Sequence, residues 1–96
     1  MNKLSNQILA VSLRYLTETD LKNRIIQKFK NIEWNEILEI LNEIGNLKTT
    51  SQEYAVRYRR NEIEKRDIIK QLGEKFPNYK KSLIANVFAQ SLFETR

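Results

Sequence analysis

Arginine, lysine and tyrosine side chains gather between residues 54 and 70 of this 96-residue chain. Guanidinium groups bind phosphate oxygens through paired hydrogen bonds, and tyrosine rings can stack on unpaired bases. Proteins hold nucleic acids with groups of these kinds, so the sequence predicts a binding surface in this segment. Its candidate residues are Arg57, Arg59, Arg60, Lys65, Arg66, Lys70, Tyr54 and Tyr58.

The four arginines are expected to contact phosphate, with Lys65 and Lys70 supporting them and Tyr58 stacking on a base. Arg57 and Arg60 share one face of a helix and the other two arginines lie on another face, so the cations form a broad band. Nothing in their spacing indicates recognition of base edges. The predicted affinity is therefore mostly electrostatic and falls steeply with salt.

The alternative interpretation is a solvated helix whose charges pair with one another. Glu62 and Arg66 are four residues apart, in the favourable order for an ion pair on a helix, and Glu53, Glu64 and Asp67 lie close by. Exposed pairs of this kind contribute little to stability and have no binding role. The sequence leaves both interpretations open.

Charge is unevenly distributed along the chain, whose formal net charge is +5. Residues 48–81 contain ten Lys and Arg against five Asp and Glu, whereas residues 33–47 contain four Glu and no basic residue. This asymmetry predicts a basic surface beside an acidic one. The possible partners are therefore a nucleic acid or a protein with an acidic surface.

The acidic residues Glu33, Glu36, Glu39 and Glu43 follow one another at helical spacing. Carboxylates in such a row can bind a divalent cation or act as an acid–base pair. No histidine and no second acidic cluster accompanies them, so we expect a solvent-exposed face that docks against the basic helix. No metal site is predicted.

Catalytic groups are scarce in this sequence, which contains no His and no Cys. Pairs of nucleophile and base, thiolate zinc sites and the usual haem ligation are therefore excluded, and two glycines cannot form a phosphate-binding loop. The aromatic residues Trp34, Tyr15 and Phe29 occur beside Ile and Leu at helical spacing and are predicted to be core. We predict a protein that is not an enzyme and holds no cofactor.

A protein–protein interaction module is the alternative function. Such a chain would be a small inhibitor, an adaptor or a dimerising subunit, and its long helix would dock an acidic protein surface. We expect a homodimer that buries Tyr54, Tyr58 and Ile63 in an isologous contact. The apolar run near the N-terminus is interrupted by polar residues and too short to span a membrane, so a cytoplasmic regulatory or accessory protein is expected.

The apolar residues recur mainly at intervals of three and four, and two glycines and one proline provide little turn chemistry for a sheet. The fold is predicted to be all-α, with residues 1–96 forming a single domain. We expect a compact bundle or orthogonal array of four to five helices. The predicted helices cover residues 2–16, 17–30, 31–45, 50–72 and 78–93, and the first two are either separate or one bent helix.

Residues 50–72 are predicted to form the long helix of the array. Thr50 and Glu53 fit a capping box at its start, and Gly73 with Pro77 predicts its end between Leu72 and Lys75. The preceding helix is predicted to begin after a cap at Asn31 and to end at Gly45. The basic residues would then lie in the middle of one straight helix.

The stretch DIIKQLGEKFPNYKKSLIANVFAQSLFET, residues 67–95, resembles the helical hairpin that opens the bacterial HU and IHF proteins. The shared pattern is an apolar start, Glu-Lys, a short turn, Lys-Lys, and an apolar Val-Phe helix ending in Phe-Glu. In that family, DNA-binding β-arms follow the hairpin. The resemblance implies a similar packing unit, and it carries no binding residues over to this chain.

Overall fold

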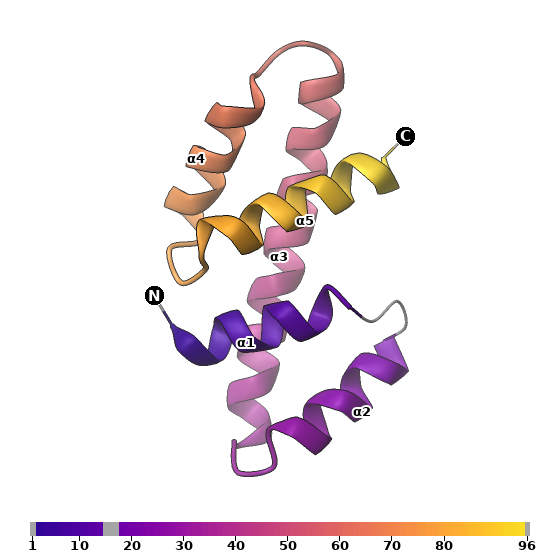
Figure 1. The fold of residues 1–96 in the computed structure, drawn as a ribbon, viewed down its shortest axis with the longest axis vertical. Coiled ribbons are helices and arrows are strands. Elements are labelled where there is room, and N and C mark those ends of the chain that lie inside the picture. Colours follow the sequence, from indigo (N-terminus) through magenta and orange to yellow (C-terminus); the bar gives the residue numbers. More distant parts are fainter. Residues whose placement is uncertain (1, 15–17, 96) are drawn as a thin grey trace.

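The computed structural model describes residues 2–14 and 18–95, which form five helices and contain no strand (Figure 1). In chain order the helices are α1 (Lys3–Ser12), α2 (Glu18–Lys28), α3 (Trp34–Arg59), α4 (Lys65–Lys75) and α5 (Lys81–Glu94). The predicted all-α array with one long helix is confirmed. None of the described helices combines the length and the apolar character needed to cross a bilayer.

Helix α3 is the axis on which the other helices pack. Its 26 residues correspond to about 39 Å at 1.5 Å per residue, and the longest dimension of the molecule is 44 Å. Figure 1 shows α1 crossing the first half of α3 and α5 crossing the second half, with α2 beside α1 and α4 beside α5. The molecule therefore has two packed ends that share a single helix.

The predicted position of the long helix, residues 50–72, is wrong. Helix α3 begins at Trp34, continues without interruption through Gly45 and Thr50, and ends at Arg59. Residues 60–64 form a turn, and the residues from Lys65 onward belong to a separate helix. Neither the end predicted at Gly45 nor the capping box predicted at Thr50 exists.

The reason for this error lies in the buried stripe of α3. Its buried residues recur every three or four positions on both sides of Gly45 and face α1 and then α5. A glycine inside a helix costs about 1 kcal/mol relative to alanine, which is less than the gain from burying several large apolar side chains. The buried residues are Ile37, Ile40, Ile44, Leu47, Ser51, Tyr54 and Ala55.

The real end of α3 is made by Asn61, which has a φ of 59°. The Asn61 N–H donates to the carbonyl of Tyr58, and the Glu62 N–H donates to the carbonyl of Arg57, both at 3.0 Å. This pair of hydrogen bonds around a left-handed residue is the Schellman ending of a helix, in which asparagine can replace glycine. Asn61 therefore ends the long helix and directs the chain into α4.

The remaining helix boundaries differ by a few residues from the predicted ones. Of the two alternatives predicted for the first helices, the structure contains two separate helices, α1 and α2, which pack against each other. Helix α3 is preceded by Glu33 rather than capped by Asn31, and α5 begins at Lys81 rather than at residue 78. Helix α4 ends at Lys75, within the predicted interval. Tyr15 lies outside the described residues.

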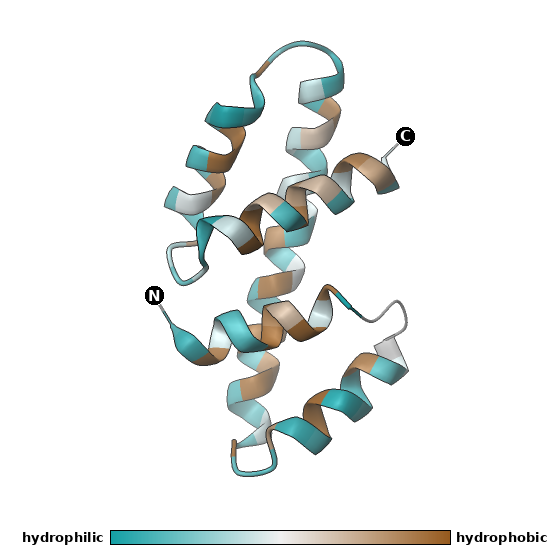
Figure 2. Ribbon diagram, in the orientation of Figure 1, coloured by the Kyte–Doolittle hydropathy of each residue, from teal (hydrophilic) through white to brown (hydrophobic). Residues whose placement is uncertain are grey.

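The core contains apolar residues from all five helices. Figure 2 shows apolar residues on the sides of the helices that face one another and hydrophilic residues on the outer sides. Trp34 and Phe29 pack against this core as partly buried residues, as predicted. The largest fully buried side chains include Phe88, Ile8, Leu9, Ile25, Ile37, Leu47, Ile68, Leu72 and Ile84.

Asn6 joins α1 to the loop between α4 and α5. Its Nδ2 donates to the carbonyl of Asn2 at 2.7 Å and to the carbonyl of Asn78 at 2.9 Å, and its Oδ1 accepts from the Lys80 N–H at 2.8 Å. The residue is buried and all three of its bonds end on backbone groups. Asn6 therefore positions the chain immediately before α5.

Replacing Asn6 with alanine is expected to lower the free energy of unfolding by about 2 kcal/mol. The substitution removes the partner of the Lys80 N–H and one of the two donors to the Asn78 carbonyl, which still accepts from the Asn2 N–H, in partly buried surroundings. Urea unfolding followed by circular dichroism measures the loss. The matched control is Gln7→Ala on the exposed side of the same helix, which should change stability by less than about 0.5 kcal/mol; equal losses would contradict this role of Asn6.

Candidate nucleic-acid interface

The structure distributes the eight predicted binding residues over two helices and a turn. Four of them lie on the last two turns of α3, one lies in the turn and three lie on α4. They are Tyr54, Arg57, Tyr58 and Arg59 on α3, Arg60 in the turn, and Lys65, Arg66 and Lys70 on α4. Five of the eight residues line two adjoining surfaces, and the other three lie outside both.

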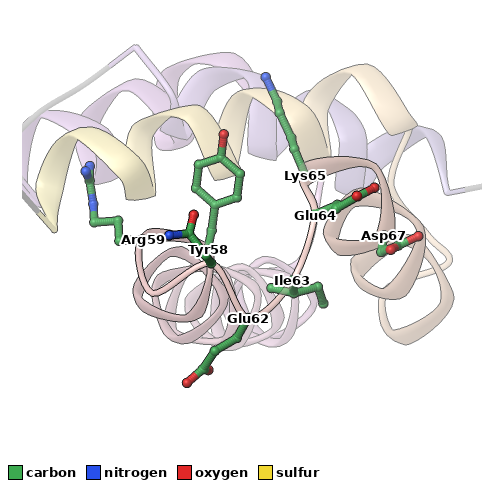
Figure 3. Close-up of a pocket in the computed structure, with 8 residues that line it drawn as sticks. Tyr58, Arg59, Glu62, Ile63, Glu64, Lys65 and Asp67 are labelled. Carbon is green, nitrogen blue, oxygen red and sulfur yellow. The ribbon is translucent and has the colours of Figure 1, made fainter.

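The first surface is an open pocket of about 950 Å³ at the junction of α3 and α4, which we call the turn pocket. In Figure 3, the side chains of Tyr58, Arg59 and Lys65 extend toward the side on which α5 lies, whereas Glu62 points to the opposite side. The turn pocket is lined by Tyr58, Arg59, Asn61, Glu62, Ile63, Glu64, Lys65 and Asp67.

Tyr58 is held in place by helix α5. Its ring meets the ring of Phe88 edge-on, with centroids 5.9 Å apart and an interplanar angle of 86°, while 37% of the residue remains exposed. Arg59 donates from Nη2 to the carbonyl of Leu92, also on α5. The turn pocket therefore presents a fixed aromatic surface, beside which a base could stack.

The second surface is a groove of about 570 Å³ between α4 and the start of α5, which we call the cationic groove. Four of its five lining residues carry a positive charge, the fifth is the half-buried Ile69, and no carboxylate lines it. Lys65 belongs to both surfaces and connects them. The lining residues are Lys65, Arg66, Ile69, Lys70 and Lys81.

Lys81 is the residue of this groove that the sequence did not predict. It is the first residue of α5, and it reaches the groove because α4 and α5 pack against each other. A weak signal exists in the sequence: the Lys80–Lys81 pair lies two residues beyond Pro77, at the start of a helix that must return toward the basic segment. Only the packing of the two helices shows that the pair meets that segment.

The carboxylates near these cations leave the guanidinium groups accessible. Arg66 Nη2 is 3.9 Å from Glu64 Oε2, with both side chains more than three-quarters exposed. Arg57 Nε is 3.7 Å from Glu62 Oε2, with both about half exposed. Exposed pairs at such distances contribute at most about 1 kcal/mol, so a polyanion can displace the carboxylates.

Tyr54, one of the candidate binding residues, belongs to the core. Its residue is 6% exposed, and its hydroxyl donates to Gln71 Oε1 at 2.7 Å. The guanidinium of Arg57 and the ammonium of Lys75 lie 5.5 Å and 5.3 Å from the ring centroid. Tyr54 and Arg57 therefore connect α3 to α4 and lie outside both surfaces, as does the exposed Arg60.

The acidic residues Glu36, Glu39 and Glu43 lie in the first half of α3. They share this helix with Arg57 and Arg59, so they cannot dock against the basic segment of their own chain as we had expected. Among the described residues, no group of three or more acidic side chains is arranged to hold a metal ion. The acidic and basic residues are therefore separated along one helix.

Comparison with protein-family models, curated proteins and solved structures finds no match for this chain. The resemblance of residues 67–95 to the HU and IHF hairpin thus gains no support from these comparisons. What the structure contains is a pair of packed helices, α4 and α5.

Proposed function

We propose that this protein binds nucleic acid through the cationic groove and the adjoining turn pocket. The observation that supports the proposal is the convergence of four cationic side chains from two helices on a groove without a carboxylate. Lys65, Arg66, Lys70 and Lys81 would contact phosphate. Arg59 and Tyr58 would extend the contact into the turn pocket.

The chemistry of these side chains suits a sugar–phosphate backbone rather than a particular base sequence. Lysine and arginine neutralise phosphates and release counterions, so affinity falls steeply as salt rises. The partly exposed ring of Tyr58 lies beside Lys65 in the same pocket, where it could stack on one unpaired base. We therefore expect a preference for single strands and a non-catalytic role as a cytoplasmic accessory or regulatory factor.

Reversing the charge of three lysines of the groove tests this proposal. The variant Lys65→Glu, Lys70→Glu, Lys81→Glu is expected to bind a fluorescently labelled single-stranded oligonucleotide at least about tenfold more weakly in low salt, because three phosphate contacts become repulsive. Fluorescence anisotropy measures the affinity, and circular dichroism verifies that the helices persist. Each reversal lowers the formal charge by two, from +5 to −1 in total.

A variant with the same net charge separates the groove from a general charge effect. Its three reversals lie on and after α2, at the other end of the molecule (Figure 1). It should retain most of the affinity, and an equal loss in both variants would contradict the assignment of the groove. The control reversals are Lys22→Glu, Lys28→Glu and Lys30→Glu.

The groove also suits an acidic protein surface, because the apolar side chain of Ile69 lies among its cations. The isologous homodimer expected from the sequence has less support, since Tyr54 is buried within its own chain and Tyr58 packs on Phe88. Size-exclusion mass before and after nuclease treatment discriminates the two functions. A mass that nuclease leaves unchanged, with no bound nucleic acid, favours the protein partner.

A further inference from the structure

Helix α3 has an outer face that no other described helix covers. In Figure 1, α1 and α5 cross in front of α3, and none of the described helices passes behind it. The buried residues of α3 face α1 and α5, whereas the residues on the opposite side of the helix are exposed and line neither the cationic groove nor the turn pocket. These residues, which we call the outer face, are Asn35, Leu38, Glu39, Asn42, Asn46, Thr49, Glu53, Val56 and Arg57.

The outer face has a large apolar side chain near each end. Leu38 and Val56 are both 39% exposed, although each could be buried against a partner. They are 18 residues apart, which is five turns of an α-helix, so their side chains leave α3 in the same direction about 27 Å from each other. The outer face therefore carries two equivalent apolar positions on one side of its midline.

Charge on the outer face has opposite sign at the two ends. Glu39 follows the first apolar residue and Arg57 follows the second, and these two residues are also five turns apart. Among the described residues, Glu39 belongs to no ion pair. The side chain of Arg57 is about half exposed, beside Glu62 and over the ring of Tyr54. Because an exposed pair such as that with Glu62 is weak, the guanidinium can bind a second carboxylate.

We propose that two copies of this chain pair through their outer faces, with the two α3 helices antiparallel about a two-fold axis near residues 47 and 48. Leu38 of each copy then contacts Val56 of the other, and Glu39 contacts Arg57 of the other. Such an axis keeps the apolar contacts on one side of the interface and the ionic contacts on the other. Parallel helices would instead place like charges side by side, which is unfavourable.

The centre of the outer face suits the same contact. Asn42, Asn46 and Thr49 lie there, and their short side chains allow two helices to approach closely. Each of these side chains can both donate and accept a hydrogen bond across the axis. The cationic groove lies on α4 and α5, so it stays accessible in both copies.

Sedimentation equilibrium of the full chain tests the dimer, after nuclease treatment, removal of nucleic acid by salt and return to physiological salt. One helix face buries a modest area, so we expect a dissociation constant of about 1–100 µM. The measured mass should rise with concentration toward twice the 11.5 kDa of one chain. Leu38→Gln should raise the dissociation constant at least about tenfold, because it removes both symmetry-related apolar contacts. The mass of a single chain up to about 300 µM would overturn the proposal.

Exchange of the two charges identifies the residues that pair. Glu39→Arg alone places two arginines in each ionic contact, and Arg57→Glu alone places two carboxylates there, so each should weaken the dimer at least about tenfold. The double variant restores opposite charges and should regain most of the affinity. Glu74→Arg makes the same charge change at an exposed position of α4 and should leave the dimer unchanged. If the double variant fails to recover, the pairing of Glu39 with Arg57 is wrong.

Disulfide formation tests the direction of the helices, because the chain contains no cysteine. Asn46→Cys lies beside the two-fold axis, where the Cα atoms of the two copies come within the limit of about 7 Å for a disulfide. Asn35→Cys places the two thiols about 37 Å apart along antiparallel helices and should not cross-link. Equal cross-linking of both variants would overturn the antiparallel contact. That result, or a monomer, would leave the proposed nucleic-acid binding untouched.

Discussion

Replacing Phe88 with alanine is expected to lower the free energy of unfolding by about 3–5 kcal/mol. Phe88 is fully buried in helix α5, which packs against α1, α3 and α4. The substitution leaves a cavity that three neighbouring helices cannot all move to fill, and it removes the edge contact with Tyr58. Urea denaturation followed by circular dichroism measures the loss.

Phe93→Ala is the matched control, because the same residue type lies on the same helix with 67% of its surface exposed. Its truncation should cost less than about 1 kcal/mol, since little of its apolar area is removed from water on folding. Similar losses in the two variants would show that the face of α5 turned toward α3 is wrongly assigned. Phe88→Ala should also weaken oligonucleotide binding, because α5 carries Lys81 and supports Tyr58.

The helical class and most of the core could be predicted from the spacing of apolar residues. Ile8, Ile25, Ile37, Ile44 and Val87 lie within the predicted helices at helical spacing from other apolar residues, and they are buried. This succeeds because a helix must bury one face, and the period of that face is recorded directly in the order of residues. The spacing of apolar residues is a local property of each segment, so it can be recognised without knowledge of the tertiary structure.

Helix ends were predicted less well because two local signals conflicted with the stripe. Gly45 and the Thr50–Glu53 pair resemble an end and a start, yet buried residues continue across both. The true end depends on Asn61 in a left-handed conformation, and asparagine is a common but weak signal for that position. A capping motif stabilises a helix by about 1 kcal/mol. Burial of a continuous apolar face stabilises it by more, so α3 continues through both signals.

The candidate interface was only partly predictable for a different reason. Spacing placed the cations on one helix, whereas the groove depends on the packing of α4 against α5, which brings Lys81 to Lys65 and Lys70. The burial of Tyr54 also follows from tertiary contacts, since its hydroxyl donates to Gln71 and the ammonium of Lys75 lies over its ring, both on α4. The residue types therefore predicted a cationic surface, whereas the packing of the helices determines which residues lie on it.

Gly45 allows the course of α3 to be tested directly, because it is exposed and a methyl group added there would meet no atom within 4 Å. Gly45→Pro is expected to be less stable than Gly45→Ala by about 3 kcal/mol or more. Proline removes a hydrogen bond inside the helix and its ring clashes with the carbonyl four residues earlier, whereas alanine favours the helix. Thermal and urea unfolding of the two variants measure the difference.

The direction of each change distinguishes a continuous helix from one that ends at Gly45. In a continuous helix, Gly45→Ala should stabilise the protein by about 0.4–1 kcal/mol relative to the natural residue, because alanine loses less backbone entropy on folding. At a left-handed helix end, the same alanine would be strained and destabilising. Loss of stability in Gly45→Ala would therefore contradict the single long helix, and with it the separation of the acidic and basic residues along that helix.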